Sequence, residues 1–249
     1  MPAPSPSHRI VETPVRDLVL ETPARARVFE RLGIDYCCGG RQTLRDACQA
    51  ANRSIGEVTA ELERVESFAA ETDWRNASLA DLAQHIVDKH HSFTQAEINR
   101  LTNLIVKVVV AHGASRPELA RLQTIFAGLG EELTEHMRKE ETLLFPYISE
   151  LEEAARTGHR PPEPMFGTVQ NPIAAMTMDH EASAQALEKM REMTDGYAVP
   201  KGACASYRAL YQALPALAAD LHQHIHLENN ILFPRAIELE DNFSQHSRR

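Results

Sequence analysis

Two stretches of the sequence carry histidine and glutamate at the same spacing. His136 is followed four residues later by Glu140, and His224 by Glu228, and a Phe-Pro pair follows each glutamate at the same offset. Residues four apart lie on one face of an α-helix. Imidazole nitrogens and carboxylate oxygens bind metals, and burial of an ionised carboxylate without a partner is costly. The spacing therefore indicates two matching halves of one metal site.

Two further histidines complete the pattern. His90 precedes the first copy and His180 precedes the second, and each lies on the apolar stripe of its expected helix. Two residues equidistant from the turn of an antiparallel hairpin lie at the same height. The midpoints between successive histidines fall in expected turns, at Gly113, Gly158 and Gly202. All four histidines are therefore expected at one level of a helical bundle.

The expected donor set is four imidazoles and two carboxylates, without a thiolate. Structural zinc sites usually hold four ligands and often use cysteine, and calcium and magnesium prefer oxygen ligands. Mixed imidazole and carboxylate donors suit non-haem iron. Six ligands are too many for one open site, so the pattern predicts two metal ions that share two bridging glutamates, with an oxo or hydroxo bridge. Two manganese ions or an iron–zinc pair satisfy the same pattern.

The rest of the chain supplies helices that position these residues. It has 249 residues and only 11 glycines, and its aliphatic residues recur every three or four positions. The expected fold class is all-α, an up-down-up-down four-helix bundle preceded by a small helical domain. The expected domain limits are 1–66 for the small domain, 67–77 for a linker and 78–241 for the bundle. The long helices are expected near 78–112, 116–156, 172–195 and 203–240.

The composition excludes several classes of function. The formal charge is −9, which disfavours nucleic acid as a partner because duplex affinity comes mainly from neutralising phosphates. No apolar run reaches the length of a membrane span, so we expect no membrane association. The first ten residues lack the apolar core of a secretory signal, and four cysteines are too few for a disulfide scaffold. We therefore expect a cytoplasmic protein.

A second motif lies in the N-terminal part, where Cys37 and Cys38 are adjacent and two glycines follow them. Neighbouring Cα atoms are about 3.8 Å apart, which is shorter than the usual disulfide span. A bond between the two sulfurs would be strained and easily reduced. The pair suits a redox switch, a thiol that reacts with nitric oxide, or transient metal contact. The alternative is two small residues that fill a tight turn.

Together these motifs are similar to a known family. The repeat at 90–234 resembles a hemerythrin-like domain, and Asp35-Tyr36-Cys37-Cys38-Gly39-Gly40 resembles the signature of the short helical domain that precedes it in the repair of iron centres family. The resemblance covers about 10–240. It implies a cytoplasmic di-iron protein that helps to restore iron–sulfur clusters damaged by nitric oxide or peroxide, by donating iron.

The resemblance also implies roles for individual residues. The metal ligands would be His90, His136, His180 and His224, with Glu140 and Glu228 as bridging carboxylates, and Cys37 and Cys38 would be the redox pair. The partners would be damaged or apo iron–sulfur proteins as iron acceptors, with nitric oxide or dioxygen as small ligands. Neither nucleic acid nor membrane is expected, and a homodimer is left open.

Two alternatives remain open at this point. His91 is adjacent to His90 and competes with it as a ligand, although it falls off the stripe that runs from Ile86 to Phe93. The second alternative concerns function, because a di-iron centre with open positions could reduce nitric oxide or peroxide, or serve as a gas or redox sensor. Whether the protein is an enzyme is therefore not decided by the sequence.

Overall fold

The computed structural model describes residues 10–65 and 73–246. The described chain divides into two compact units, Met1–Ala77 with His222–Leu232, and Ser78–Leu221 with Phe233–Arg249. Part of the expected linker, positions 67–72, lies outside the described residues. Throughout the described ranges the regular elements are helices, and the only β-type pairing there is an isolated bridge between Pro14 and Thr43. None of the described helices is long and apolar enough to cross a membrane.

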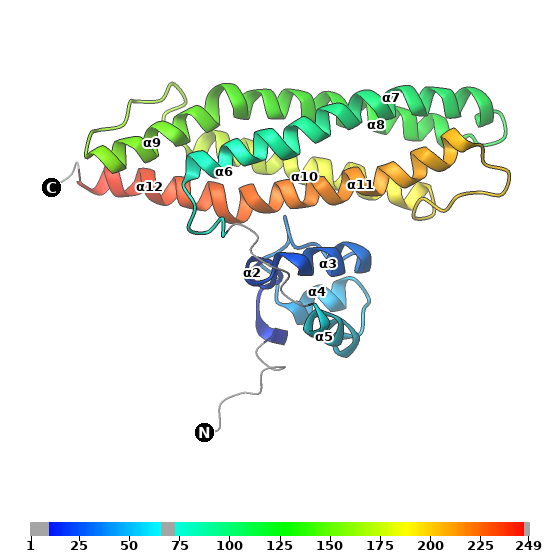
Figure 1. Ribbon diagram of the computed structural model, residues 1–249, viewed down its shortest axis with the longest axis horizontal. Coiled ribbons are helices and arrows are strands. Elements are labelled where there is room, and N and C mark those ends of the chain that lie inside the picture. The colour runs from blue at the N-terminus through cyan, green and yellow to red at the C-terminus, as the bar shows by residue number, and fades with distance from the viewer. Residues whose placement is uncertain (1–9, 66–72, 247–249) are drawn as a thin grey trace. The chain divides into compact units, whose positions relative to one another are not determined.

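The long helices from α6 to α12 form the four-helix bundle that the sequence predicts. Figure 1 shows long helices that run back and forth along one direction. Three of these rods are assembled from consecutive shorter helices. Helix α7 packs on α8, α8 on α10, and α9 on both α6 and α12. The all-α, up-down-up-down bundle is therefore confirmed. The bounds are α6 Leu79–His85, η2 Ile86–His91, α7 Ser92–His112, α8 Glu118–Lys139, η3 Glu140–Leu144, α9 Phe145–Thr157, α10 Gln170–Met193, α11 Ala205–Leu227, η4 Glu228–Leu232 and α12 Phe233–His246.

One apolar cluster holds the four rods of the bundle together. Its buried members come from α7, α8, α10 and α11, with Leu101, Phe126 and Leu217 among those that are almost completely inaccessible. The start of α6 is secured by Glu152 of α9, whose carboxylate accepts the backbone N–H groups of Leu79 and Ala80 at 2.7 and 3.0 Å. These contacts hold the helices rigidly enough to position buried polar side chains between them.

Three of the rods are interrupted by a short π-helix, η2, η3 or η4. η3 and η4 begin at Glu140 and Glu228 of the expected site, and η2 ends at His91, the alternative to His90. Such single-turn π segments are rare and occur often at functional sites. Pro146 and Pro234 are the second residues of α9 and α12, which follow η3 and η4, and the missing N–H of each proline removes one backbone bond.

The first unit has its own small core. Its N-terminal helices are α2 Val15–Glu21, the 3-10 helix η1 Pro23–Arg25, α3 Ala26–Leu32, α4 Leu44–Ala50 and α5 Ile55–Arg64. Leu18, Phe29, Leu44 and Leu62 fill the space between them and are at most 1% exposed. Helix α3 ends at Gly33, whose φ of 70° lets the chain turn toward the segment that carries the two cysteines.

Candidate metal centre

The buried polar residues of the bundle form two groups of metal-binding side chains. One contains His91, Glu140, His224 and Glu228, and the other contains His136, Glu140, His180 and Glu228, with the ligand atoms of each group within 4.8 Å of one another. All six side chains are at most 3% exposed. Both groups contain the same two glutamates. The two groups are therefore joined through these shared carboxylates.

The distances within the groups fit atoms that share a metal ion. Ligand atoms bound at about 2.1 Å with angles of 90–110° lie about 3.0–3.4 Å apart. His136 Nε2 lies 3.1 Å from His180 Nε2 and 3.3 Å from Glu140 Oε2. His91 Nε2 lies 3.4 Å from the same oxygen, and His224 Nε2 lies 2.8 Å from Glu228 Oε1. The nitrogens that face the glutamates are thus all Nε2 atoms.

The charge of this set also calls for cations. Two ionised carboxylates buried in a water-poor interior are costly without a compensating positive charge. If the Nδ1 atom of an imidazole carries the proton, its Nε2 lone pair faces a carboxylate oxygen, and the two acceptors repel each other unless a cation lies between them. The donor set therefore fits metal ions well.

The structure places His91, rather than His90, beside Glu140. His90 instead directs Nδ1 to Asp220 Oδ1 at 3.0 Å, and its ring lies 5.8 Å from that of His85. The physical reason is the π-helix η2, which inserts one extra residue in the turn after Ile86 and so moves the inward position from 90 to 91.

A signal for His91 was present in the repeat. The two His-x-x-x-Glu motifs and the two Phe-Pro pairs each recur at an interval of 88 residues. His180 lies 89 residues after His91 but 90 after His90, so His91 keeps the closer register. The α-helical stripe from Ile86 to Phe93 favoured His90 because it assumed a regular helix throughout.

Two carboxylates on the outer side orient the histidine rings. Glu141 Oε1 lies 2.7 Å from His91 Nδ1, and Asp179 Oδ2 lies 3.3 Å from His136 Nδ1. An imidazole that donates from Nδ1 to a carboxylate presents an unprotonated Nε2 to a metal and becomes a more basic ligand. Both carboxylates are about four-tenths exposed, so they lie between the buried groups and solvent. The sequence pattern did not single out Glu141, although it directly follows a candidate ligand.

The phenylalanines of the Phe-Pro pairs stack on two of the imidazoles. The ring of Phe145 lies 5.8 Å from that of His91 with 20° between their planes, and Phe233 lies 6.0 Å from His180 with 3° between planes. The two contacts occupy equivalent places in the two halves of the repeat. They exclude water from one face of each ring and restrict its rotation, so the Phe-Pro pairs contribute to the site as well as to packing.

The cysteine motif forms a tight turn in the first unit. Asp35 Oδ1 accepts the N–H groups of Cys37 and Cys38 at 2.9 and 3.0 Å, and Oδ2 accepts that of Gly39 at 2.7 Å. All the cysteines of the chain are free, and the two adjacent sulfurs are 3.8 Å apart. The hydrogen bond to Cys38, burial and the nearby Asp35 carboxylate raise the pKa of Cys37 well above its ordinary value. Cys37 is therefore protonated at neutral pH, and Cys38 is the more accessible thiol.

The same turn contacts the 222–232 segment, which belongs to the first unit. Asn230 Nδ2 donates to the carbonyl oxygen of Cys37 at 3.2 Å, and His226 Nδ1 lies 3.4 Å from the carbonyl oxygen of Tyr36. The ring of Tyr36 also lies 5.4 Å from that of His226. Burial lowers the pKa of His226 to about 4, so this imidazole is neutral at physiological pH. His226 therefore takes part in holding the cysteine turn.

Comparison with known families matches both parts of the chain. Residues 11–66 match a family described as a domain of unknown function, DUF542. Residues 82–236 match the hemerythrin HHE cation binding domain. The second match covers more than half of the chain and includes every residue of the two donor groups.

Curated relatives are similar over nearly their whole length. The chain is 33% identical to the iron-sulfur cluster repair protein YtfE of Pectobacterium atrosepticum, over 90% of this chain and 96% of that protein. It is 34% identical to the protein of the same name from Escherichia coli O81, over 91% of this chain and 97% of the relative. With its DUF542 region, its hemerythrin cation-binding domain and these relatives, the chain belongs to the family of the iron–sulfur cluster repair proteins, known as the repair of iron centres family.

Proposed function

We propose that this protein binds two iron ions between its bundle helices and donates iron for the repair of iron–sulfur clusters damaged by nitrosative or oxidative stress. The strongest support is the pair of donor groups that share two glutamates. The names of its relatives support the repair role. The proposed ligands are His91, in place of His90, with His136, His180 and His224, and Glu140 and Glu228 as bridging carboxylates.

The chemistry of the donor set supports both binding and release of iron. Imidazole and carboxylate donors together suit ferrous and ferric iron. Ferrous iron lies low in the affinity order of divalent metals, so a site with nitrogen and oxygen ligands can give it up to a stronger, thiolate-rich acceptor. The half-exposed carboxylates of Glu141 and Asp179 provide oxygen ligands between the buried site and solvent. These features fit an iron donor better than a permanently closed site.

We assign a redox or iron-contact role to Cys37 and Cys38. Both are free thiols on a turn whose backbone is held by one carboxylate, so their positions are well defined. We place this role in the cytoplasm, where thiols are kept reduced. The acceptors in this proposal are damaged or apo iron–sulfur proteins, and nitric oxide or dioxygen are the small ligands of the centre.

The first test is the metal content of the purified protein. We expect two irons per chain, and loss of iron in His136→Ala and Glu228→Ala. A direct comparison of His91→Ala with His90→Ala tests the ligand assignment, because only the former should lose metal. His159→Ala, which changes an exposed histidine outside both groups, is the matched control. One zinc per chain, or full iron content in His136→Ala, would refute the di-iron proposal.

The second test is transfer of iron to a cluster enzyme that has been inactivated by nitric oxide. The loaded protein should restore its activity when a sulfide source is present, in proportion to the iron that leaves the bundle. Failure under conditions in which free ferrous iron succeeds would contradict the donor role. Sustained consumption of nitric oxide with an electron donor, over many turnovers per chain, would instead identify a reductase.

A further inference from the structure

The bundle has a cavity at the end that is remote from the metal-binding groups. It has a volume of about 430 Å³ and lies between two loops of the second unit, the α7–α8 turn and the segment that precedes α11. His91 directly precedes α7 and His112 ends it, and 21 helical residues span about 30 Å. The cavity is thus separate from the centre described above. Its lining includes His112, Arg116, Pro200, Lys201, Gly202 and Tyr207.

The charge of this lining is opposite to that of the whole chain. Arg116 and Lys201 come from the two opposite loops, and no lining residue is acidic, whereas the chain carries a net charge of −9. Arg116 Nη1 lies 3.7 Å from Glu118 Oε1, and both side chains are about one-third exposed or more. An exposed pair of this length contributes little and leaves the guanidinium able to bind a ligand.

The two loops also lead directly into long helices. The first loop precedes α8 and the second precedes α11. The first backbone N–H groups of a helix have no partner within the helix, and together with the helix dipole they favour a negative group. The first turn of α11 contains no acidic residue that would compete for this position. The first turn of α8 does contain one, Glu118, so it is the N-terminus of α11 that acts in the same direction as the side-chain cations.

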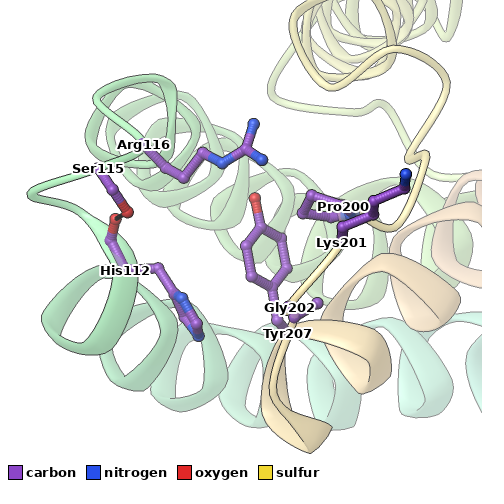
Figure 2. Close-up of a pocket in the computed structure, with 8 residues that line it drawn as sticks. His112, Ser115, Arg116, Pro200, Lys201, Gly202 and Tyr207 are labelled. Atoms are coloured by element: carbon purple, nitrogen blue, oxygen red, sulfur yellow. Dashed lines mark hydrogen bonds between the residues drawn. The ribbon is translucent and has the colours of Figure 1, made fainter.

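The remaining lining residues provide apolar surface and space for an organic ligand that is larger than an inorganic ion. Figure 2 shows the guanidinium of Arg116 and the hydroxyl of Tyr207 turned toward each other, with Pro200 and Lys201 of the opposite loop beside them. The buried ring of Tyr207 lies 5.2 Å from that of His112, and its hydroxyl donates to Tyr211 at 3.3 Å. The volume lies within the usual range of small-molecule sites.

We propose that this cavity binds a small organic oxyanion, whose phosphate or carboxylate group lies between Arg116 and Lys201 while its carbon skeleton contacts Pro200 and the Tyr207 ring. Phosphates and carboxylates share this chemistry, because both offer charged oxygens that accept from a guanidinium and an ammonium. The assignment rests on the second unit alone and does not depend on iron binding.

The test is a titration of the full, metal-loaded protein with glycerol 3-phosphate and, separately, with glutarate, followed through the backbone amide signals of Gly202 and Arg116. These amides lie far enough from the metal site to be observed. We expect saturable shifts with at least one of the two probes. A stronger response to glycerol 3-phosphate identifies a phosphate ligand, and a stronger response to glutarate identifies a carboxylate.

Two double variants distinguish specific binding in the cavity from non-specific electrostatic attraction to the protein surface. The double variant Arg116→Gln/Lys201→Gln should lose about tenfold or more in affinity, because it removes both charged donors to the oxyanion. Lys107→Gln/Lys189→Gln removes the same charge from exposed lysines outside the cavity and should bind as the parent does. Equal loss in both doubles, or shifts that never saturate with either probe, would overturn the proposal.

Discussion

The carboxylate that orients His91 offers a sharp test of how the bundle tunes its metal affinity. Glu141 Oε1 lies 2.7 Å from His91 Nδ1, the length of a strong charge-assisted hydrogen bond, whereas Asp179 lies 3.3 Å from the equivalent atom of His136. Removal of such an outer partner typically lowers metal affinity about 10- to 100-fold. We expect Glu141→Ala to lower the affinity for iron by an amount in that range. Asp179→Ala should lower it about tenfold or less, because the Asp179 bond to His136 is longer than the usual 3.2 Å limit.

The assay is competition for ferrous iron against a chelator of known affinity, with thermal unfolding of the apo protein measured in parallel. Glu141→Gln keeps an oxygen that can accept from Nδ1 but removes the charge, so its affinity should lie between those of the parent and Glu141→Ala. Glu132→Ala removes an exposed carboxylate of α8 and is the matched control. The reasoning is refuted if Glu141→Ala binds iron as Glu132→Ala does, or if Asp179→Ala loses more affinity than Glu141→Ala.

Three further predictions concern the thiols and the backbone. Cys37, whose pKa is raised, should be alkylated more slowly than the exposed Cys204 at pH 7. The alkylation rate of Cys37 should keep rising above pH 9 as its thiolate forms. Peptide mass spectrometry can follow both thiols, and equal rates at pH 7 would contradict the prediction. Gly40→Ala places Cβ 2.3 Å from a backbone oxygen and should lower the free energy of unfolding by about 1–3 kcal/mol. Gly128 in α8 has open space around it, so Gly128→Ala should raise the free energy of unfolding by about 0.5–1 kcal/mol. Chemical denaturation measures both values. Pro215→Ala should raise the melting temperature, because the proline lies inside α11 and removes one backbone bond; an unchanged or lower value would count against this.

The fold could be predicted because the bundle depends on a regular signal. Aliphatic residues at three- and four-residue spacing indicate amphipathic helices, and the short connections between them leave few arrangements other than an antiparallel bundle. The matching heights of His136, His180 and His224 followed from the same regularity. These features need only the helical repeat and the positions of the turns.

The details that escaped prediction depend on departures from regularity. The position of His91, rather than His90, beside Glu140 follows from a π-helix, which no single residue type predicts. The Asp35 carboxylate that holds the cysteine turn, and the cavity formed by Arg116 and Lys201, join atoms through loop conformations that the helical pattern does not encode. Such features become visible only in three dimensions.

The three π segments have a consequence for how the bundle tolerates change in length. Each adds one residue to a turn, so the helix that follows is rotated by about 100° relative to an uninterrupted helix. Deletion of one residue within η2 would leave the hydrophobic pattern of α6 and of α7 intact, yet would turn one of them away from the core. The bundle therefore consists of helical segments whose rotation about their axes is fixed by the π segments between them. Insertions and deletions in these turns should be far more harmful than those in the long connection at 158–169, which lies between two complete helices.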